Sequence, residues 1–217
     1  MPQKLILMFR LPDLRKKILF VLGVLVVFRL VAAIPVPSVD PVRLKDFLAG
    51  NQFFGLLNIF SGGVLDNLSI VMLGVGPYIT ASIIMQLLTM LFPVLKEMYH
   101  EEGEAGRQKF NQYSRLLTVP LAMLQGYGLL IILMRQQIIP QLDFFGFATN
   151  MIVVTAGTLF LMWLGELISE KGIGNGISLL IFAGIVSSIP VDLRQTLFTF
   201  DISQLPAYLA FVAVALV

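Results

Sequence analysis

Residues 116–134 read LLTVPLAMLQGYGLLIILM, and this run contains no charged side chain. The hydrocarbon core of a bilayer is about 30 Å thick, so a helix needs roughly 20 apolar residues to cross it. The run therefore predicts a transmembrane helix. Four other apolar runs predict further crossings, of which the last is short for a span: 18–34, 69–92, 150–168 and 177–189.

Prolines mark the ends of three of these spans, at Pro35, Pro93 and Pro190, because a proline inside a helix removes a hydrogen bond and clashes with the preceding turn. A sixth apolar run begins at Ala207 and reaches Val217, which is too short to cross a bilayer. We therefore expect an all-α, polytopic membrane protein, and we expect the chain to be a truncated piece of it.

Composition excludes several classes of protein. Hydrophobic residues make up 57% of the chain and charged residues 13%, whereas soluble domains have about 25% charged residues, so a soluble globule is ruled out. The absence of cysteine excludes disulfides, cysteine-ligated metal centres and thiol nucleophiles. His100 is the one histidine, and its neighbours Glu101 and Glu102 are a weak indication of a metal site. We expect no metal, no cofactor and no enzymatic activity.

The distribution of cations predicts the orientation of the chain. Most of the 15 Lys and Arg residues fall in segments 1–17 and 93–115 and at Lys171, on one side of the predicted spans. Short loops rich in these cations stay in the cytoplasm, so we expect a cytoplasmic N-terminus. Residues 1–17 fit an amphipathic helix on the anionic leaflet. Residues 4–34 also fit a cleaved signal peptide, but the spans that follow favour a retained helix.

An external stretch between the first two spans, 50–68, is too apolar for an ordinary loop and too short and interrupted to span the membrane. Irregular backbone at membrane depth needs protein or a water-filled cavity around it. The stretch is therefore either interfacial or re-entrant, and composition does not decide between the two.

The cytoplasmic loops favour ordinary structural roles. Segment 96–115 has mixed charge and fits a solvated hairpin extension better than a binding motif. Segment 172–176 (GIGNG) resembles a phosphate loop, but the Walker lysine and a preceding strand are lacking. A tight turn between antiparallel helices explains its glycines better.

The second span is unusually rich in small and polar residues. Gly74, Gly76 and Pro77 lie near its start, and polar side chains follow along it. Small residues let helices pack closely, and polar groups at membrane depth are costly, so these residues indicate either helix packing or a surface facing something more polar than lipid. The polar residues, with two from the third and fourth spans, are Tyr78, Thr80, Ser82, Gln86, Thr89, Gln125 and Glu166.

Several segments together resemble the bacterial SecY family, the channel subunits of the Sec protein-translocation complex. The resemblance extends in order from Leu14 to the end of the chain, which makes it more specific than any single motif. The segments that carry it are 60–65 (FSGGVL), 73–88 (LGVGPYITASIIMQLL), 103–109 (GEAGRQK), 160–166 (FLMWLGE), 170–178 (EKGIGNGIS) and 181–186 (IFAGIV).

The resemblance implies a protein of ten helices, in which two inverted five-helix halves surround an hourglass pore closed by an aliphatic ring and an external plug. This chain would supply the first half and the start of the sixth helix. The implied divisions are an amphipathic segment 1–17, a five-helix repeat 18–190 with a plug at about 51–68 and a cytoplasmic loop 93–115, an external loop 191–205, and a sixth-helix start 206–217.

The resemblance also implies which residues form the site. Val75, Ile79, Ile177 and Ile181 match the pore ring, and each pair is spaced i, i+4 and so shares one helix face. Val75 departs from the isoleucine common in the family. The plug would contain Phe53, Phe54, Leu57, Ile59, Phe60, Ser61, Gly62 and Gly63. One side of the lateral gate would include Thr80, Ile83, Gln86, Leu87 and Gln125.

The implied function is a passive protein-conducting channel in the bacterial cytoplasmic membrane. Its implied partners are the SecE and SecG subunits, the SecA motor ATPase, the ribosome, signal-sequence-bearing preproteins and membrane lipid, with no direct readout of nucleic acid. An inverted-repeat transporter is an alternative, but it should place charges near mid-membrane, where the spans offer only Arg29 near an outer end. An intramembrane protease is disfavoured because no Ser/His or paired-Asp arrangement is evident.

Overall fold

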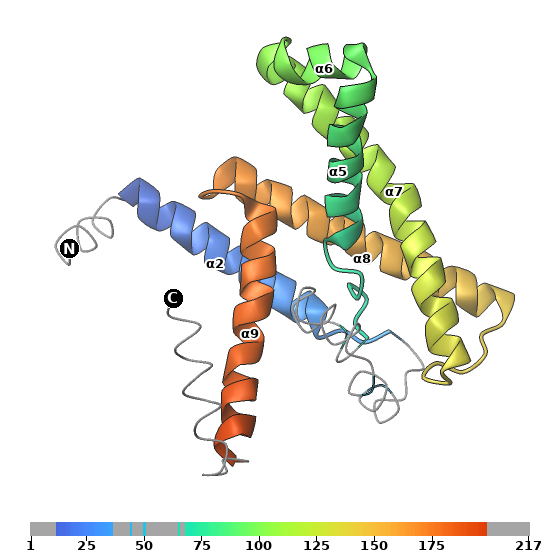
Figure 1. The fold of residues 1–217 in the computed structure, drawn as a ribbon. Coiled ribbons are helices and arrows are strands. Elements are labelled where there is room, and N and C mark those ends of the chain that lie inside the picture. The colour runs from blue at the N-terminus through green and yellow to red at the C-terminus, as the bar shows by residue number, and fades with distance from the viewer. Residues whose placement is uncertain (1–11, 37–43, 45–49, 51–64, 66–67, 199–217) are drawn as a thin grey trace, which may run out of the picture.

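The structure, a computed structural model, describes residues 12–36, 44, 50, 65 and 68–198, and for 188–198 it describes the backbone alone. Regular structure in these residues is helical, apart from one isolated antiparallel bridge between Pro35 and Ser69, which confirms the all-α class. The helices, shown in Figure 1, are α2 (Pro12–Ala32), α5 (Gly76–Leu91), α6 (Pro93–His100), α7 (Gly103–Arg135), α8 (Phe144–Lys171) and α9 (Gly176–Phe198).

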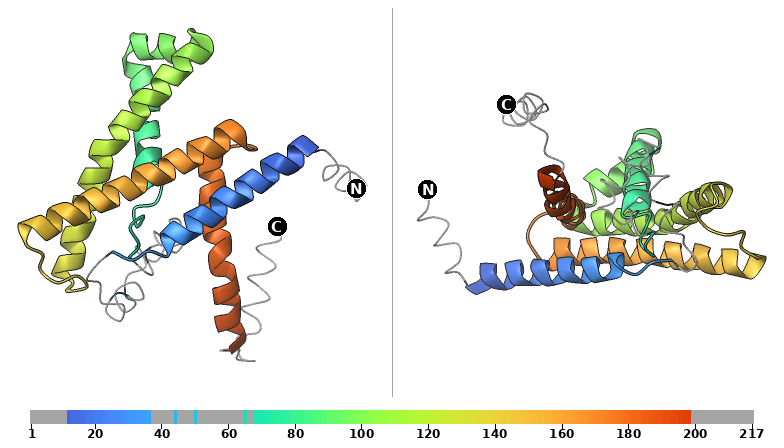
Figure 2. Two further views of the ribbon diagram at one scale, coloured as in Figure 1. Left: turned by 180° about the vertical axis from the view of Figure 1, so that it is seen from behind. Right: turned by 90° about the horizontal axis from the view of Figure 1, so that it is seen from below.

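Helix α8 is the centre of the arrangement. Its N-cap is Asp143, whose carboxylate accepts a hydrogen bond from the Gly146 N–H at 2.9 Å. α2 runs beside α8 in the opposite direction, and the two helices form one layer. α5, α7 and α9 all lie on the same face of that layer (Figures 1 and 2). α8 packs against each of these four helices.

Residues 69–75, which we expected to begin the second span, form turns instead, and α5 begins at Gly76. The N–H of Val36 donates to the Leu68 carbonyl at 2.8 Å, and the N–H of Ile70 donates to the Ile34 carbonyl at 3.0 Å. Gly74 then adopts a φ of 59°, which a residue with a Cβ rarely tolerates. This pairing with the end of the first helix segment prevents α5 from starting earlier.

Two of the described helices, α7 and α8, are long and apolar enough to cross a membrane. α5 and α6 add a third crossing if this pair, bent by 113°, counts as one span. α2 falls outside this group because Arg15, Lys16 and Lys17 lie in its first half and Arg29 lies near its end. The apolar part of α9 that qualifies is short, Gly176–Ser187. The protein is therefore a multi-pass membrane protein, but fewer than the five expected crossings meet this test.

Two boundaries differ from the sequence prediction. α9 continues past Pro190 to Phe198, so residues 191–198 of the expected external connection are helical. The connection 93–115, expected as a solvated hairpin extension, has helical arms made of α6 and the first turns of α7. Its side chains are mostly exposed, as a solvated extension requires.

Candidate functional site

An open cavity of about 960 Å³ is lined by residues of α5, α6, α7, α8 and the start of α9. Near the starts of α5 and α9 its wall includes the aliphatic side chains of Ile79, Ile177 and Ile181. Toward the α6–α7 hairpin its wall is formed by hydroxyl and amide groups, among them Tyr99 and Gln108. The cavity thus joins a polar chamber to an aliphatic patch.

The four residues assigned to the pore ring belong to one hydrophobic cluster. Val75 is buried in it, with 7% of its surface exposed, while Ile79, Ile177 and Ile181 are partly buried and pack against it. Val75 does not line the cavity, whereas the other three do. Val75 is the N-cap of α5, and its carbonyl accepts a hydrogen bond from the Ile79 N–H at 3.1 Å, so these two residues lie one turn apart.

Glycines on α8 bring both ring-bearing segments into place. A Cβ at Gly157 would collide with the Ile70 carbonyl oxygen, so only glycine lets the 69–75 turns lie directly on α8. A Cβ at Gly165 would collide with Cδ1 of Ile177, and a Cβ at Gly176 would collide with the Gly165 carbonyl oxygen. α9 therefore starts in direct backbone contact with α8, with Ile177 against Gly165.

An ion pair lies on the cavity wall at the same end as the polar chamber. Nε of Arg115 on α7 lies 2.6 Å from Oε1 of Glu166 on α8, and both residues line the cavity. From the sequence Glu166 was one of the polar residues for which helix packing and a surface more polar than lipid both stayed open. Because α7 and α8 run antiparallel, a cation near the start of one apolar span and a carboxylate near the end of the next lie at similar depth, and this signal could have predicted the pair.

A polar stripe on α5 also faces the cavity. Tyr78, Ser82 and Gln86 recur at intervals of four residues and all line it. From the sequence these polar residues were unusual for a membrane span, but it stayed open whether they pack against another helix or face a polar environment. The structure places these three on the cavity wall.

Residues assigned to the lateral gate are divided by the structure. Ile83 and Gln86 line the cavity and are exposed in this chain. Thr80 is partly buried, and its hydroxyl donates to the Gly76 carbonyl at 3.0 Å within α5. Leu87, with 54% of its surface exposed, and the partly buried Gln125 on α7 are not among the cavity-lining residues.

The residues assigned to the plug lie outside the described part of the chain: Phe53, Phe54, Leu57, Ile59, Phe60, Ser61, Gly62 and Gly63. The described residues that follow them, Leu65 and Leu68, are buried. Leu65 and Leu68 are 4% and 1% exposed and belong to a second hydrophobic cluster with Met72 and Ile138. Among the residues that the structure describes, no group of three or more His, Cys, Asp or Glu side chains could hold a metal ion.

A family model described as SecY matches residues 69–217. The chain belongs to the SecY family. Relatives named "Protein translocase subunit SecY" include those of Streptomyces coelicolor, 48% identical over 196 residues, and Corynebacterium glutamicum, 45% identical over 197 residues. These alignments cover 84% and 85% of this SecY-family chain. The chain spans 45% and 44% of the lengths of those relatives, or somewhat under half.

Solved structures share the fold of this SecY-family chain. One is described as "Sec61 in the Canine ribosome-channel complex from the endoplasmic reticulum", with a TM-score of 0.56 and 23% identity. Another is described as "The structure of a protein conducting channel", with a TM-score of 0.54 and 24% identity. Each match covers 78% of this chain and 36% of the other chain.

Proposed function

We propose that the chain forms half of a protein-conducting channel in the bacterial cytoplasmic membrane, which passes unfolded preproteins across and releases hydrophobic segments sideways into lipid. The single observation that carries this proposal is the clustering of Val75, Ile79, Ile177 and Ile181 beside a large polar chamber. Two segments far apart in sequence supply these side chains, and three of the four line the same cavity. Family membership supports the proposal independently.

The physical basis is the contrast between chamber and ring. A cavity of about 960 Å³ has room for roughly 30 water molecules, and its amide and hydroxyl groups would solvate an extended backbone. A ring of aliphatic side chains is costly to wet, so it stops ions when no polypeptide is present. Side chains of Ile and Val can rotate aside for a passing chain, so the ring closes the path without a covalent or charged barrier.

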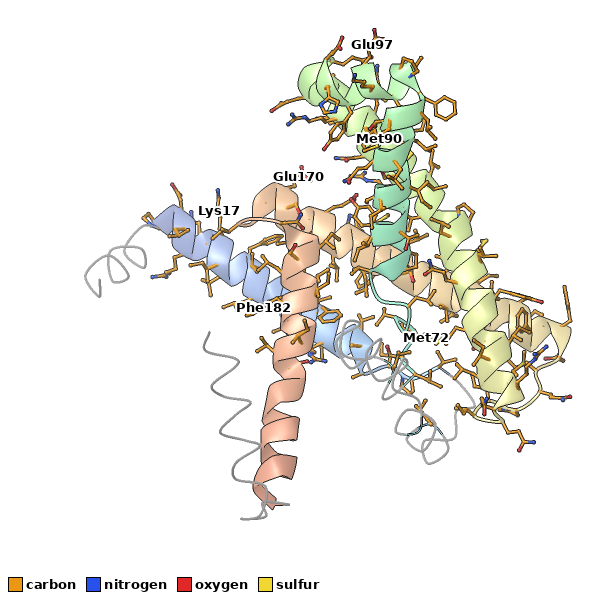
Figure 3. The ribbon with its side chains drawn as sticks, in the orientation of Figure 1. Lys17, Met72, Met90, Glu97, Glu170 and Phe182 are labelled. Atoms are coloured by element: carbon orange, nitrogen blue, oxygen red, sulfur yellow. The ribbon has the colours of Figure 1, made fainter. Side chains whose placement is uncertain are left out.

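We propose a cytoplasmic N-terminus, so that the chamber opens toward the cytoplasm. The start of α2, the α6–α7 hairpin and the end of α8 carry most of the described cations, and the positive-inside rule assigns such a side to the cytoplasm. Figure 3 shows Lys17, Glu97 and Glu170 in the upper half of the view and Met72 in the lower half. The upper side would then face the cytoplasm.

The proposed partners follow from family membership and not from any contact in this chain. They are the SecE and SecG subunits, the SecA motor ATPase, the ribosome, preproteins with signal sequences, and membrane lipid. The energy for transport would come from the ribosome or the motor, because the chain supplies only a path. We propose no catalytic step, no cofactor and no readout of nucleic acid.

The test uses a full-length SecY protein that carries residues 69–198 of this chain, reconstituted in planar bilayers. Replacing Val75, Ile79, Ile177 and Ile181 by glycine should raise the resting ion conductance. The matched control replaces Leu91 on α5 and Phe182 on α9 by glycine, since these side chains are 73% and 61% exposed and belong to neither the ring nor the lateral gate. Unchanged conductance in the ring variant, or an equal rise in the control, would overturn the assignment.

A further inference from the structure

The junction between α8 and α9 contains a hydroxyl that joins the two helices. The Ser169 hydroxyl donates to the Gly165 carbonyl at 3.0 Å, one turn back along α8. The same oxygen accepts a hydrogen bond from the N–H of Gly176, the first residue of α9, at 2.8 Å. Ser169 is exposed in this chain and lies on the cavity wall.

This contact fixes the first residue of α9 at its closest approach to α8. The first N–H groups of a helix have no partner within the helix, so an external acceptor must satisfy them. The Gly176 N–H donates to the Ser169 hydroxyl oxygen, and the Ser178 N–H donates to Asn175 Oδ1 at 3.1 Å. Gly176 also lies directly against the Gly165 carbonyl, with no room for a Cβ.

The next residue along the chain is Ile177, whose side chain lies against Gly165. Ile181 follows one turn later on the same face. The position of both ring residues of α9 therefore depends on where the helix begins. A helix end released from Ser169 could tilt or shift along α8 and carry Ile177 and Ile181 away from the cluster that contains Val75.

We propose that Ser169 is a positioning residue for the ring: its hydroxyl anchors the start of α9 to α8 and so holds Ile177 and Ile181 where the ring closes. The inference rests on the proposed channel function, because a ring must exist for its closure to be controlled. Ser169 does not belong to the aliphatic cluster itself, and its effect acts through the backbone of Gly176.

The first experiment measures the anchor directly and does not depend on channel activity. Ser169→Ala in the full-length SecY protein that carries residues 69–198 removes the acceptor for Gly176. Amide hydrogen exchange of residues 176–180 should become about fivefold faster, as expected for the loss of one hydrogen bond. The control is Ser187→Ala, because the Ser187 hydroxyl donates to Gly184 within α9 and joins no second helix. Unchanged exchange at 176–180 would overturn the inference.

The second experiment measures the ring by resting conductance in planar bilayers. Ser169→Ala should raise conductance above the Ser187→Ala control. Adding Ser169→Ala to the double variant Ile177→Gly/Ile181→Gly should give no further rise, because Ser169 acts through these two residues. Independent, additive effects would refute the positioning role. If Ile177→Gly raises conductance and Ser169→Ala does not, the inference fails and the channel function stands.

Conductance unchanged in both variants would mean that the proposed channel function has failed, and the inference with it. Ser169→Cys is the second variant for the case in which the alanine protein does not assemble. A thiol is a weaker hydrogen-bonding group than a hydroxyl. Amide exchange at 176–180 should therefore be faster, and resting conductance higher, in Ser169→Cys than in the serine protein and the Ser187→Ala control. Values equal to those of the serine protein would contradict the anchor.

Discussion

Gly157 offers a sharp test of how the ring is held, because it lies where the 69–75 turns meet α8. An alanine Cβ at this position would collide with the Ile70 carbonyl oxygen, would lie 2.9 Å from the Ile70 carbonyl carbon, and would lie 3.2 Å from Cγ1 of Val71. Two of these three atoms belong to the backbone, so rotation of a side chain cannot relieve the clash. The turns must move away from α8 and carry Val75 with them.

The magnitude follows from two opposing terms. Overpacking a tight contact costs about 1–3 kcal/mol. Alanine in place of glycine inside a helix returns roughly 0.5–1 kcal/mol. We therefore expect Gly157→Ala to lower the free energy of unfolding by about 1–2 kcal/mol.

The matched control is Gly128→Ala, because Gly128 lies inside α7 and a Cβ there meets no atom within 4 Å. This variant should raise stability by about 0.5–1 kcal/mol. Both variants are made in the full-length SecY protein that carries residues 69–198, and denaturant unfolding in detergent micelles gives the two free energies. If Gly157→Ala is as stable as Gly128→Ala, the direct contact between the turns and α8 does not exist and the account of how Val75 is positioned is wrong.

Three further predictions concern other parts of the chain. A double-mutant cycle with Arg115→Gln and Glu166→Gln should give a coupling energy below about 1 kcal/mol that falls with added salt, because the Arg115 side chain is half exposed. A larger coupling energy that does not change with salt would contradict this. A cysteine that replaces Ile59, once crosslinked to the channel wall, should block export, whereas a freely reactive thiol with normal export would contradict the plug. Among the described residues the buried Thr155 hydroxyl has no hydrogen-bond partner, whereas the Thr158 hydroxyl donates to the Val154 carbonyl. In denaturant unfolding, Thr155→Val should therefore be neutral or stabilising by up to about 1 kcal/mol, and Thr158→Val should be destabilising. The reverse order of the two stabilities would refute this.

Apolar run length predicted the long helices well, because lipid imposes a minimum length that the sequence must meet. The runs 116–134 and 150–168 lie inside α7 and α8. The start of α7 at Gly103 was not predictable from this signal. Residues 103–115 carry mixed charge, and their helical structure depends on packing against α6, where Gly106 lies directly against the Met98 carbonyl.

The errors at 69–75 and at Pro190 have different causes. The 69–75 segment is apolar enough to continue a helix, but the Ile70 N–H donates to the Ile34 carbonyl and Ser69 forms a bridge with Pro35. A contact between segments so far apart leaves no periodic signal in the sequence. At Pro190 the local rule failed because α9 keeps its helical backbone past the proline to Phe198.

The candidate ring shows which part of a site sequence reasoning can reach. The i, i+4 spacing placed Val75 with Ile79 and Ile177 with Ile181, and the hydrogen bond from the Ile79 N–H to the Val75 carbonyl agrees with it. Spacing within one helix cannot bring the two pairs together. That step depends on backbone contacts at glycines of α8, whose role is not visible until the opposing segments are placed.

Helix α8 therefore acts as the common support for both pairs. Gly157 receives the segment that leads to Val75, and Gly165 with Ser169 receives the start of α9. The two attachment points are eight residues apart on one rigid helix, so the separation between the pairs is fixed by α8 and not by the loops that connect them. If the four residues form the proposed ring, moving either attached segment would open it while α8 stays in place. Variants at the attachment points should then alter closure more than variants of exposed side chains on α5 or α9.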